Sequence, residues 1–281
     1  MTEITAQPRV YPPVGFCIYC GSQGGDLRRE HIIPFGLGGN AILPKASCRA
    51  CEAITGSFEQ IALRGMLGKL RMRLGLQTRN KKDRPKALPL ELINPDGSIE
   101  PQLVEIDKFP AYIFVFTMPP PGILHGMEPV KDINLNGKLI TGLAEGEEER
   151  NWQDSIVIHP WAFLRMLAKI GHSFAVAELG WERFQEYKPL LKHVILESTD
   201  FVSHVVGCIG ESDGTQTILH WLRRHHINFG GKEYLVVDIS LFTQTKSPVY
   251  RVVVGEKATV SSDGTISAKS ASSNIDSTHS R

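Results

Sequence analysis

The sequence predicts an α+β protein in two parts: a small zinc-clamped N-terminal part, and a larger α+β domain with a mainly antiparallel sheet. Two C-x-x-C pairs, Cys17/Cys20 and Cys48/Cys51, carry the zinc prediction. Apolar residues recur at helical spacing along 57–76, and several β-rich runs occur in the last third of the chain. Helical and strand-like patterns in consecutive blocks are typical of the α+β class.

Composition places the chain among ordinary globular proteins. Its 281 residues, 42% hydrophobic and 22% charged, suffice for one large or two modest domains. No run of about 18 apolar residues occurs, and the opening MTEITAQPRVYPP lacks the apolar segment of a secretory signal. With four of the five cysteines in pairs and Cys208 alone, the pattern favours a reducing compartment, so we expect a cytoplasmic protein.

Charge is distributed unevenly along the chain. Residues 1–86 contain 14 Lys and Arg against six Asp and Glu, a net charge of +8, whereas the remainder carries −7. Four thiolates on one zinc ion would lower the first figure to +6. A basic N-terminal region is what a surface that meets a phosphate backbone requires.

The order of these features predicts four segments. Residues 1–76 form a zinc-bound module with a basic helix. Residues 77–89 are polar, basic and broken by prolines, so we interpret them as a linker. Residues 90–258 form an α+β domain of unknown role, and 259–281, rich in Ser and Thr, form a disordered tail.

Periodicity suggests where the main elements lie. Leu27–Ile33 is expected to be a short strand, and the second cysteine pair should open a helix. The apolar stripe predicts a helix over Ser57–Leu76. Further along, the patterns predict helix Trp161–Leu179, strands Tyr112–Phe116, Ser155–His159 and Val249–Val254, and β-rich runs at Phe201–Ile209, Thr217–Phe229 and Tyr234–Phe242.

The two cysteine pairs predict a structural zinc site. Cys17, Cys20, Cys48 and Cys51 would fill all four positions of a tetrahedral ion, which leaves no open position for catalysis. The alternative is four unliganded buried thiols. Because so short a segment buries little apolar surface, zinc binding should supply part of the local folding free energy.

A family resemblance follows from the residues between the pairs. The order is C-x-x-C, then Glu30-His31-Ile32-Ile33-Pro34, then Leu37-Gly38-Gly39, then C-x-x-C and a helix. Over about residues 15–60 this resembles the His-Asn-His (HNH) endonuclease family, in particular the branch whose ββα-metal nuclease motif is clamped by a four-cysteine zinc.

The resemblance implies a metal-dependent endonuclease. In that family the histidine takes a proton from the attacking water, and one divalent ion, Mg²⁺ or Mn²⁺, polarises the scissile phosphate. By position, His31 would be the general base and Glu30 a ligand of the ion. An imidazole pKa of about 6.5 suits a base near neutral pH, and oxygen ligands suit magnesium.

The chain departs from the family pattern at two positions. Glu52 stands where the family commonly has Asn or His as a second metal ligand, and it offers a harder, charged oxygen. The middle asparagine should fall near Leu43, whose side chain cannot orient the base. Asn40 could substitute for it if its loop folds back, and Glu59, two turns beyond Glu52, is a further candidate ligand.

Basic residues near the motif are candidates for nucleic-acid contact, with double-stranded DNA favoured: Arg28, Arg29, Arg64, Arg71, Lys81 and Lys82. The alternative function is a zinc ribbon that binds nucleic acid without cutting it. A further hypothesis is that a ligand or partner regulates the nuclease through residues 90–258. The sequence does not fix the oligomeric state.

The histidine-rich stretch His220–His226 allows three interpretations, one of which is a basic surface that contacts nucleic acid. On a strand, alternate residues would share one face and could hold a second metal ion. A half-exposed strand with histidines as fillers is the favoured interpretation.

Overall fold

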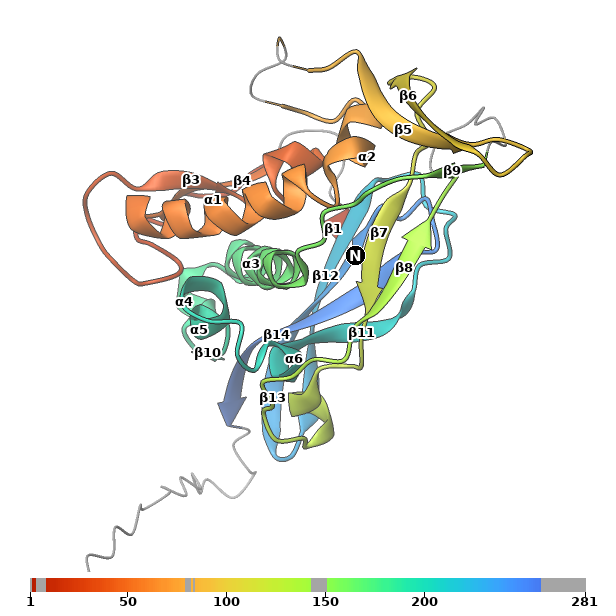
Figure 1. The fold of residues 1–281 in the computed structure, drawn as a ribbon. Coiled ribbons are helices and arrows are strands. Elements are labelled where there is room, and N and C mark those ends of the chain that lie inside the picture. Colours follow the sequence, from red (N-terminus) through yellow and green to blue (C-terminus); the bar gives the residue numbers. More distant parts are fainter. Residues whose placement is uncertain (1, 4–8, 79–81, 83, 143–150, 259–281) are drawn as a thin grey trace, which may run out of the picture.

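A large antiparallel sheet and one long helix organise the protein, as the computed structural model shows (Figure 1). The structure describes residues 2–3, 9–78, 82, 84–142 and 151–258. The predicted tail 259–281 therefore lies outside the described residues. No helix in these ranges is long and apolar enough to cross a membrane.

The large sheet has the strand order β1-β12-β13-β14-β10, with β11 also paired to β14, and all its pairings are antiparallel. This confirms the predicted α+β class with a mainly antiparallel sheet. Its strands are β1 (Thr2–Glu3), β10 (Lys188–Pro189), β11 (Val206–Glu211), β12 (His220–Phe229), β13 (Lys232–Leu241) and β14 (Pro248–Ala258).

Helix α3 (Pro160–Leu179) lies at the centre of the molecule, between the large sheet and helix α1 (Arg49–Arg64) (Figure 1). Almost all of α3 is buried because both of its sides are covered, which explains its broad apolar surface in the sequence. Pro160 starts the helix, where its missing N–H is not needed, and Gly180 follows its last residue.

The N-terminal region forms a second, smaller layer. Strand β3 (Arg28–His31) pairs antiparallel with β4 (Ala41–Ser47), and β2 (Arg9–Val10) runs parallel to β4 on its other edge. Helix α1 follows β4 almost immediately, as expected from the position of the second cysteine pair. An antiparallel strand pair is thus followed directly by a helix.

The remaining elements form two small sheets and short helices. One sheet has the order β6-β5-β9, and β7 pairs with β8. Their bounds are β5 (Ala87–Ile93), β6 (Ile99–Glu105), β7 (Ile113–Thr117), β8 (Asn136–Ile140) and β9 (Trp152–Gln153). The helices are η1 (Phe35–Leu37), α2 (Gly68–Arg73), η3 (Gly122–His125), α4 (Trp181–Phe184), α5 (Lys192–Leu196) and α6 (Val202–Val205).

Four expectations differ from the structure. The β-rich run predicted at Phe201–Ile209 begins with helix α6, and the strand β11 starts only at Val206. The predicted helix Ser57–Leu76 is interrupted at Gly65, where α1 ends before α2 begins. A Cβ at Gly65 would lie 2.8 Å from the Val157 carbonyl oxygen, so the close approach of another segment, and not periodicity, decides the break. The segment Ser155–His159 contains no strand, and β5 begins at Ala87, inside the predicted linker 77–89.

The buried core is continuous across the boundary predicted between 1–76 and 90–258. Ile32 and Ala62 belong to the same buried cluster as Phe163, Leu167 and Val252. A smaller cluster lies under the β5–β6 hairpin and consists of Leu88, Leu90, Phe109 and Tyr112. The N-terminal region therefore shares its core with α3 and the large sheet.

Candidate zinc centre and Glu-His site

The four paired cysteines come together at one end of the N-terminal layer. Their Sγ atoms all lie within 4.8 Å of one another, and those of Cys20 and Cys48 are 3.7 Å apart. A tetrahedron of sulfurs at 2.3 Å from zinc has edges of about 3.8 Å, and all four thiols are free of disulfides. The donor set and its spacing fit one zinc ion, so these cysteines could hold zinc.

Local backbone geometry places each cysteine pair. In the first, the Gly21 N–H donates to the Cys17 carbonyl at 2.8 Å, and Gly21 has φ +80°, a left-handed conformation that glycine adopts without strain. In the second, Cys48 is the N-cap of α1 and accepts the Glu52 N–H at 2.9 Å. Zinc would therefore tie a tight turn to the start of a helix.

The electrostatics of the four thiols favour a cation among them. Burial, together with the neighbouring Cys17, raises the pKa of the Cys51 thiol, and burial raises the pKa of Cys17. Burial also acts on Cys20, but hydrogen bonds from Ser22 outweigh it and lower that pKa to about 6. Four thiolates this close repel one another, and a bound divalent ion removes the penalty.

The Gly pair after the Glu-His segment shapes the turn between β3 and β4. Gly38 has φ +82°, and a Cβ at Gly39 would lie 1.9 Å from the Ile33 carbonyl oxygen. Only glycine fits so close an approach of two backbone segments. The turn returns the chain so that Glu30 lies opposite Leu43 in the β3–β4 pair.

Glu30 points into the protein and meets a buried lysine. Lys169 of α3 has no exposed surface, and its Nζ lies 2.5 Å from Glu30 Oε1 and 2.8 Å from Glu59 Oε1. The same ammonium donates a hydrogen bond to the His31 carbonyl oxygen. Burial acts to lower the pKa of Lys169, but Glu30 and Glu59 outweigh it and raise the pKa, so the side chain stays charged.

The structure therefore places a cation between two acids, but that cation is an ammonium. Glu52 is on the surface, where its Oε2 lies 3.2 Å from Arg28 Nε. Apart from the cysteines, the described part of the chain contains no group of three or more His, Cys, Asp or Glu side chains that could hold a metal ion. Glu30 and Glu52, as arranged, do not fit the shared divalent ion that the resemblance implies.

His31 is the last residue of β3 and is half-buried. Its ring centroid lies 5.5 Å from that of Phe35, whose side chain is 37% exposed. Leu43, near which the family's middle asparagine should fall, is buried, and Asn40 is half-buried just before β4. The histidine thus lies at the edge of the strand pair, beside an aromatic ring that reaches the surface.

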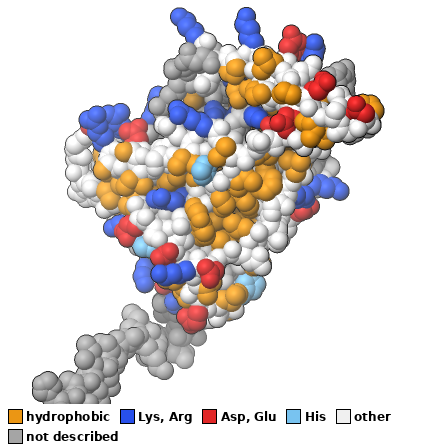
Figure 2. All heavy atoms as spheres, viewed as in Figure 1, with side chains coloured by type: hydrophobic (Ala, Val, Ile, Leu, Met, Phe, Trp, Pro, Cys, Tyr) orange, Lys and Arg blue, Asp and Glu red, His pale blue; other side chains and the backbone are white. Residues whose placement is uncertain are grey.

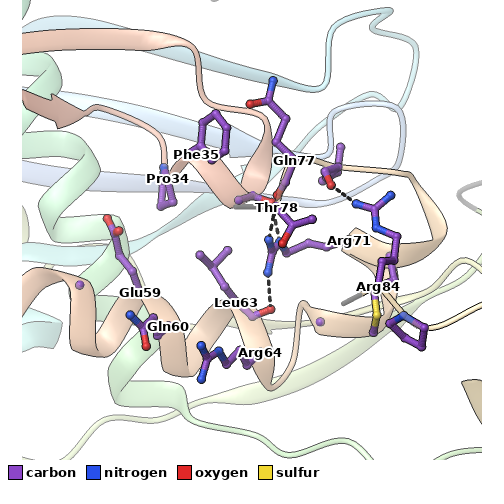
Figure 3. A pocket seen from close by; sticks show the side chains of 16 residues that line it. Pro34, Phe35, Glu59, Gln60, Leu63, Arg64, Arg71, Gln77, Thr78 and Arg84 are labelled. Carbon is purple, nitrogen blue, oxygen red and sulfur yellow. Dashed lines mark hydrogen bonds between the residues drawn. The ribbon is translucent and has the colours of Figure 1, made fainter. Parts of the chain in front are cut away.

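The predicted basic residues separate into a group near β3 and a group that lines a pocket. Lys and Arg side chains are visible over the end of the molecule that carries β3 and α1 (Figure 2). Arg28 pairs with Asp26 and Glu52, and Arg29 is exposed. Arg64 and Arg71 line a pocket together with Arg84, which sequence reasoning did not single out (Figure 3). Lys82 is exposed, and Lys81 lies outside the described residues.

The histidine-rich stretch belongs to β12 and serves packing. Buried His220 bonds through Nε2 to the Leu37 carbonyl oxygen at 2.8 Å and accepts the Phe242 N–H at Nδ1. His226 bonds to the Tyr187 hydroxyl at 3.0 Å. These separate partners agree with the interpretation of the histidines as part of a half-exposed strand.

Sequence reasoning missed the residue that binds Glu30. Lys169 is the only Lys or Arg in Leu167–Leu179, a mostly apolar part of α3. A single lysine on a buried helix indicates a paired ammonium, because an unpaired buried charge is too costly.

Comparison of the chain with protein-family models, curated proteins and solved structures finds no match in any of the three.

Proposed function

We propose that this chain is an endonuclease that hydrolyses phosphodiester bonds of nucleic acid, with double-stranded DNA the favoured substrate. The observation that carries the proposal is the position of His31 at the end of β3, in an antiparallel strand pair followed directly by a helix and joined to it by four clustered cysteines. This arrangement agrees with the order of elements that the resemblance implies.

In the proposed reaction the His31 imidazole takes a proton from the attacking water, whose oxygen bonds to phosphorus while one ester P–O bond breaks. The leaving oxygen takes a proton from solvent water. An unperturbed histidine has a pKa of about 6.5, so a large fraction is neutral and able to accept a proton near neutral pH. Arg29 and Arg64, both exposed on the same N-terminal layer, provide positive charge for the phosphate backbone. No step is assigned to a divalent ion at Glu30 and Glu52, since they face Lys169 and Arg28 instead.

A second candidate function is a zinc-stabilised module that binds nucleic acid without cutting it. Two observations favour it: the Lys169 ammonium already pairs with Glu30 and Glu59, and Leu43, near which the family's middle asparagine should fall, is a buried apolar residue. The N-terminal charge of +8 over residues 1–86 serves binding and cleavage equally well.

Supercoiled plasmid distinguishes the two functions. The zinc-loaded full chain is incubated with plasmid, with Mg²⁺, with Mn²⁺ and without added divalent ion, and the products are separated on agarose after protein removal. Nicked or linear plasmid supports the nuclease if the cleavage activity of the gel-filtration fractions follows their protein concentration. Plasmid that is retarded on native gels but returns intact after protein removal supports the binding module and contradicts the nuclease.

A further inference from the structure

A pocket of about 590 Å³ opens beside the Glu-His segment, and of its lining residues only Arg64 has a part in the reaction described above. Its walls are the turn Pro34–Gly36, the second half of α1, helix α2, and residues 76–78 and 84–85 (Figure 3). Its size is within the range of small-molecule binding sites. Phe35 lines it, and the Phe35 ring contacts His31, so the pocket adjoins the proposed catalytic residue.

The pocket is strongly positive. Arg64, Arg71 and Arg84 line it, and none of the three forms an ion pair with a carboxylate in the described part of the chain. The one acidic side chain among the lining residues is Glu59, and its Oε1 lies 2.8 Å from the Lys169 ammonium. The three arginines therefore outnumber the single acid of the lining and have no carboxylate partner of their own, so a bound anion would reduce the repulsion among them.

Arg71 is held in place at the centre of this pocket. Its guanidinium donates to the carbonyl oxygens of Gly36, Leu63 at 2.9 Å and Gln77 at 3.1 Å (Figure 3). Burial, with the charges of Arg84 and Arg64 next, lowers the pKa of Arg71. Backbone carbonyls fix the side chain but leave its charge in place, so the positive field is organised before any ligand arrives.

The uncharged lining suits a flat, polar ring. Phe35 provides an aromatic face that is 37% exposed, and Gln60, Gln77 and Thr78 provide amide and hydroxyl groups. Nucleobases stack on aromatic rings and form hydrogen bonds to amides along their edges. Phosphate oxygens are the groups that arginines bind best.

We propose that this pocket binds one nucleotide, with its phosphate at the arginines Arg64, Arg71 and Arg84 and its base against Phe35. This binding site would extend the proposed function. It rests on that function in one respect: the bound anion is assumed to be a unit of nucleic acid. The nucleotide is either one unit of a strand, drawn out beside His31, or a free nucleotide. Both present the same phosphate and base to the pocket.

Titration calorimetry on the full zinc-loaded chain, without added divalent ion, tests the proposal. The probes are 5′-dAMP, the oligonucleotide (dA)₅ and deoxyribose 5-phosphate, which lacks a base. We expect saturable binding of dAMP that Arg64→Gln weakens about tenfold, the effect of one charged hydrogen-bond partner. Phe35→Leu should weaken it about fivefold or more, the effect of one stacked base.

The matched control is Arg49→Gln, which removes the same charge from the exposed start of α1, away from the pocket. It should leave the affinity for dAMP within about twofold of the wild type. Tighter binding of (dA)₅ than of dAMP identifies a unit of a strand as the ligand, and equal binding identifies a free nucleotide.

Three results would overturn the proposal: no saturable binding of dAMP or (dA)₅, equal affinities in Arg64→Gln and Arg49→Gln, or binding of deoxyribose 5-phosphate as tight as that of dAMP. The assay detects binding without strand cleavage. A negative nuclease assay therefore does not contradict nucleotide binding in this pocket. Absence of nucleotide binding likewise does not contradict the assignment of His31 as the base.

Discussion

At the scale of single residues, Lys169 decides how the acids of the Glu-His site behave. Its ammonium contacts Glu30 and Glu59 from the buried face of α3. Without this charge the buried Glu30 and the half-buried Glu59 would be destabilised, whereas here the ammonium lies within 2.8 Å of both carboxylates. An internal ammonium therefore pairs with Glu30, one of the two acids to which the resemblance assigns a divalent ion, while the other, Glu52, pairs with Arg28.

Replacing Lys169 with Met should lower the free energy of unfolding by about 3–5 kcal/mol, because it leaves the buried Glu30 and the half-buried Glu59 without the ammonium that pairs with both. Urea unfolding followed by circular dichroism measures this value. Adding Glu30→Gln and Glu59→Gln to Lys169→Met should recover part of the loss, since the buried charges are then removed.

The control for this series is Lys192→Met, at an exposed position of α5. Its effect should stay within about 0.5 kcal/mol, as is usual for surface substitutions. Equal stabilities of Lys169→Met and Lys192→Met would contradict the importance of the buried ion pairs.

Residues of the candidate site could be predicted where the sequence pattern that indicates them is short, and could not where the contact joins distant parts of the chain. The grouping of Cys17, Cys20, Cys48 and Cys51 follows from spacing alone and agrees with the structure. The partner of Glu30 is 139 positions away, and no local pattern connects the two. Glu52 was expected beside Glu30, but nothing in the sequence shows that Glu52 forms an ion pair with Arg28 instead.

At the scale of elements, the cysteines connect the turn before β3 to the start of α1. Cys17 and Cys51 are almost fully buried, so the connection lies inside the N-terminal layer. Structural zinc contributes directly to folding free energy, since the unfolded chain has no assembled site. The orientation of α1 relative to the β3–β4 pair is therefore expected to depend on the metal.

Cys48→Ser should lower the zinc content from one ion per chain to a small fraction, because the site keeps only three thiolates. Loss of zinc should then raise hydrogen exchange in the first turns of α1 by at least tenfold. Atomic absorption and exchange mass spectrometry measure the two effects.

Cys208→Ser serves as the matched control, because Cys208 is a buried cysteine outside the cluster. It should keep one zinc per chain. Full zinc content in Cys48→Ser would exclude the four-cysteine site as the place where zinc binds.

Elements with a clear period were predictable, and those set by distant contacts were not. Helix Trp161–Leu179 and strand Tyr112–Phe116 correspond to α3 and β7 to within one residue at each end. The helix expected over Ser57–Leu76 breaks at Gly65, where the Val157 carbonyl approaches. Short-range patterns do not report such an approach.

At the scale of the whole molecule, several side chains from the second half of the chain bond to the N-terminal layer, and Glu178 is one of them, since it accepts the Tyr11 hydroxyl at 2.5 Å. His172 Nε2 bonds to the Ile18 carbonyl at 2.8 Å, and His220 Nε2 bonds to the Leu37 carbonyl at 2.8 Å. Lys169 bonds to the carbonyl oxygen of His31. With a continuous core beneath them, these bonds explain why the layer does not form a separate domain core.

These two histidines predict how stability depends on pH. Burial lowers the pKa of His172 and of His220 to about 4, from 6.5. Between pH 6.5 and 4 the unfolded chain binds more protons than the folded one, so their contribution is complete above pH 6.5 and is lost as pH falls toward 4. The expected loss is on the order of 3 kcal/mol per histidine.

Urea unfolding measured between pH 7 and pH 4 tests this dependence. His220→Gln should reduce the loss by roughly half, because one of the two titrating groups is removed. His193→Gln, at an exposed histidine of α5, should leave the pH profile unchanged. A His220→Gln profile that is parallel to the wild type would contradict the role of that histidine.

The overall class was predictable from the chain, but its assembly was not. Consecutive β-rich runs indicate an antiparallel sheet, and the structure confirms it. The position of α3 between the large sheet and α1 depends on burial on both of its sides, which its broad apolar surface suggests without naming the partners. The boundary between 1–76 and 90–258 does not separate two cores.

The central claim is that His31 activates water for cleavage, and the most direct measurement is the rate of plasmid cleavage by His31→Ala beside the wild type. His193→Ala is the control, since it removes an exposed imidazole elsewhere. We predict a loss of about 10²- to 10⁴-fold in His31→Ala, with zinc content and unfolding free energy near those of the wild type. Cleavage by His31→Ala at the wild-type rate would contradict the claim.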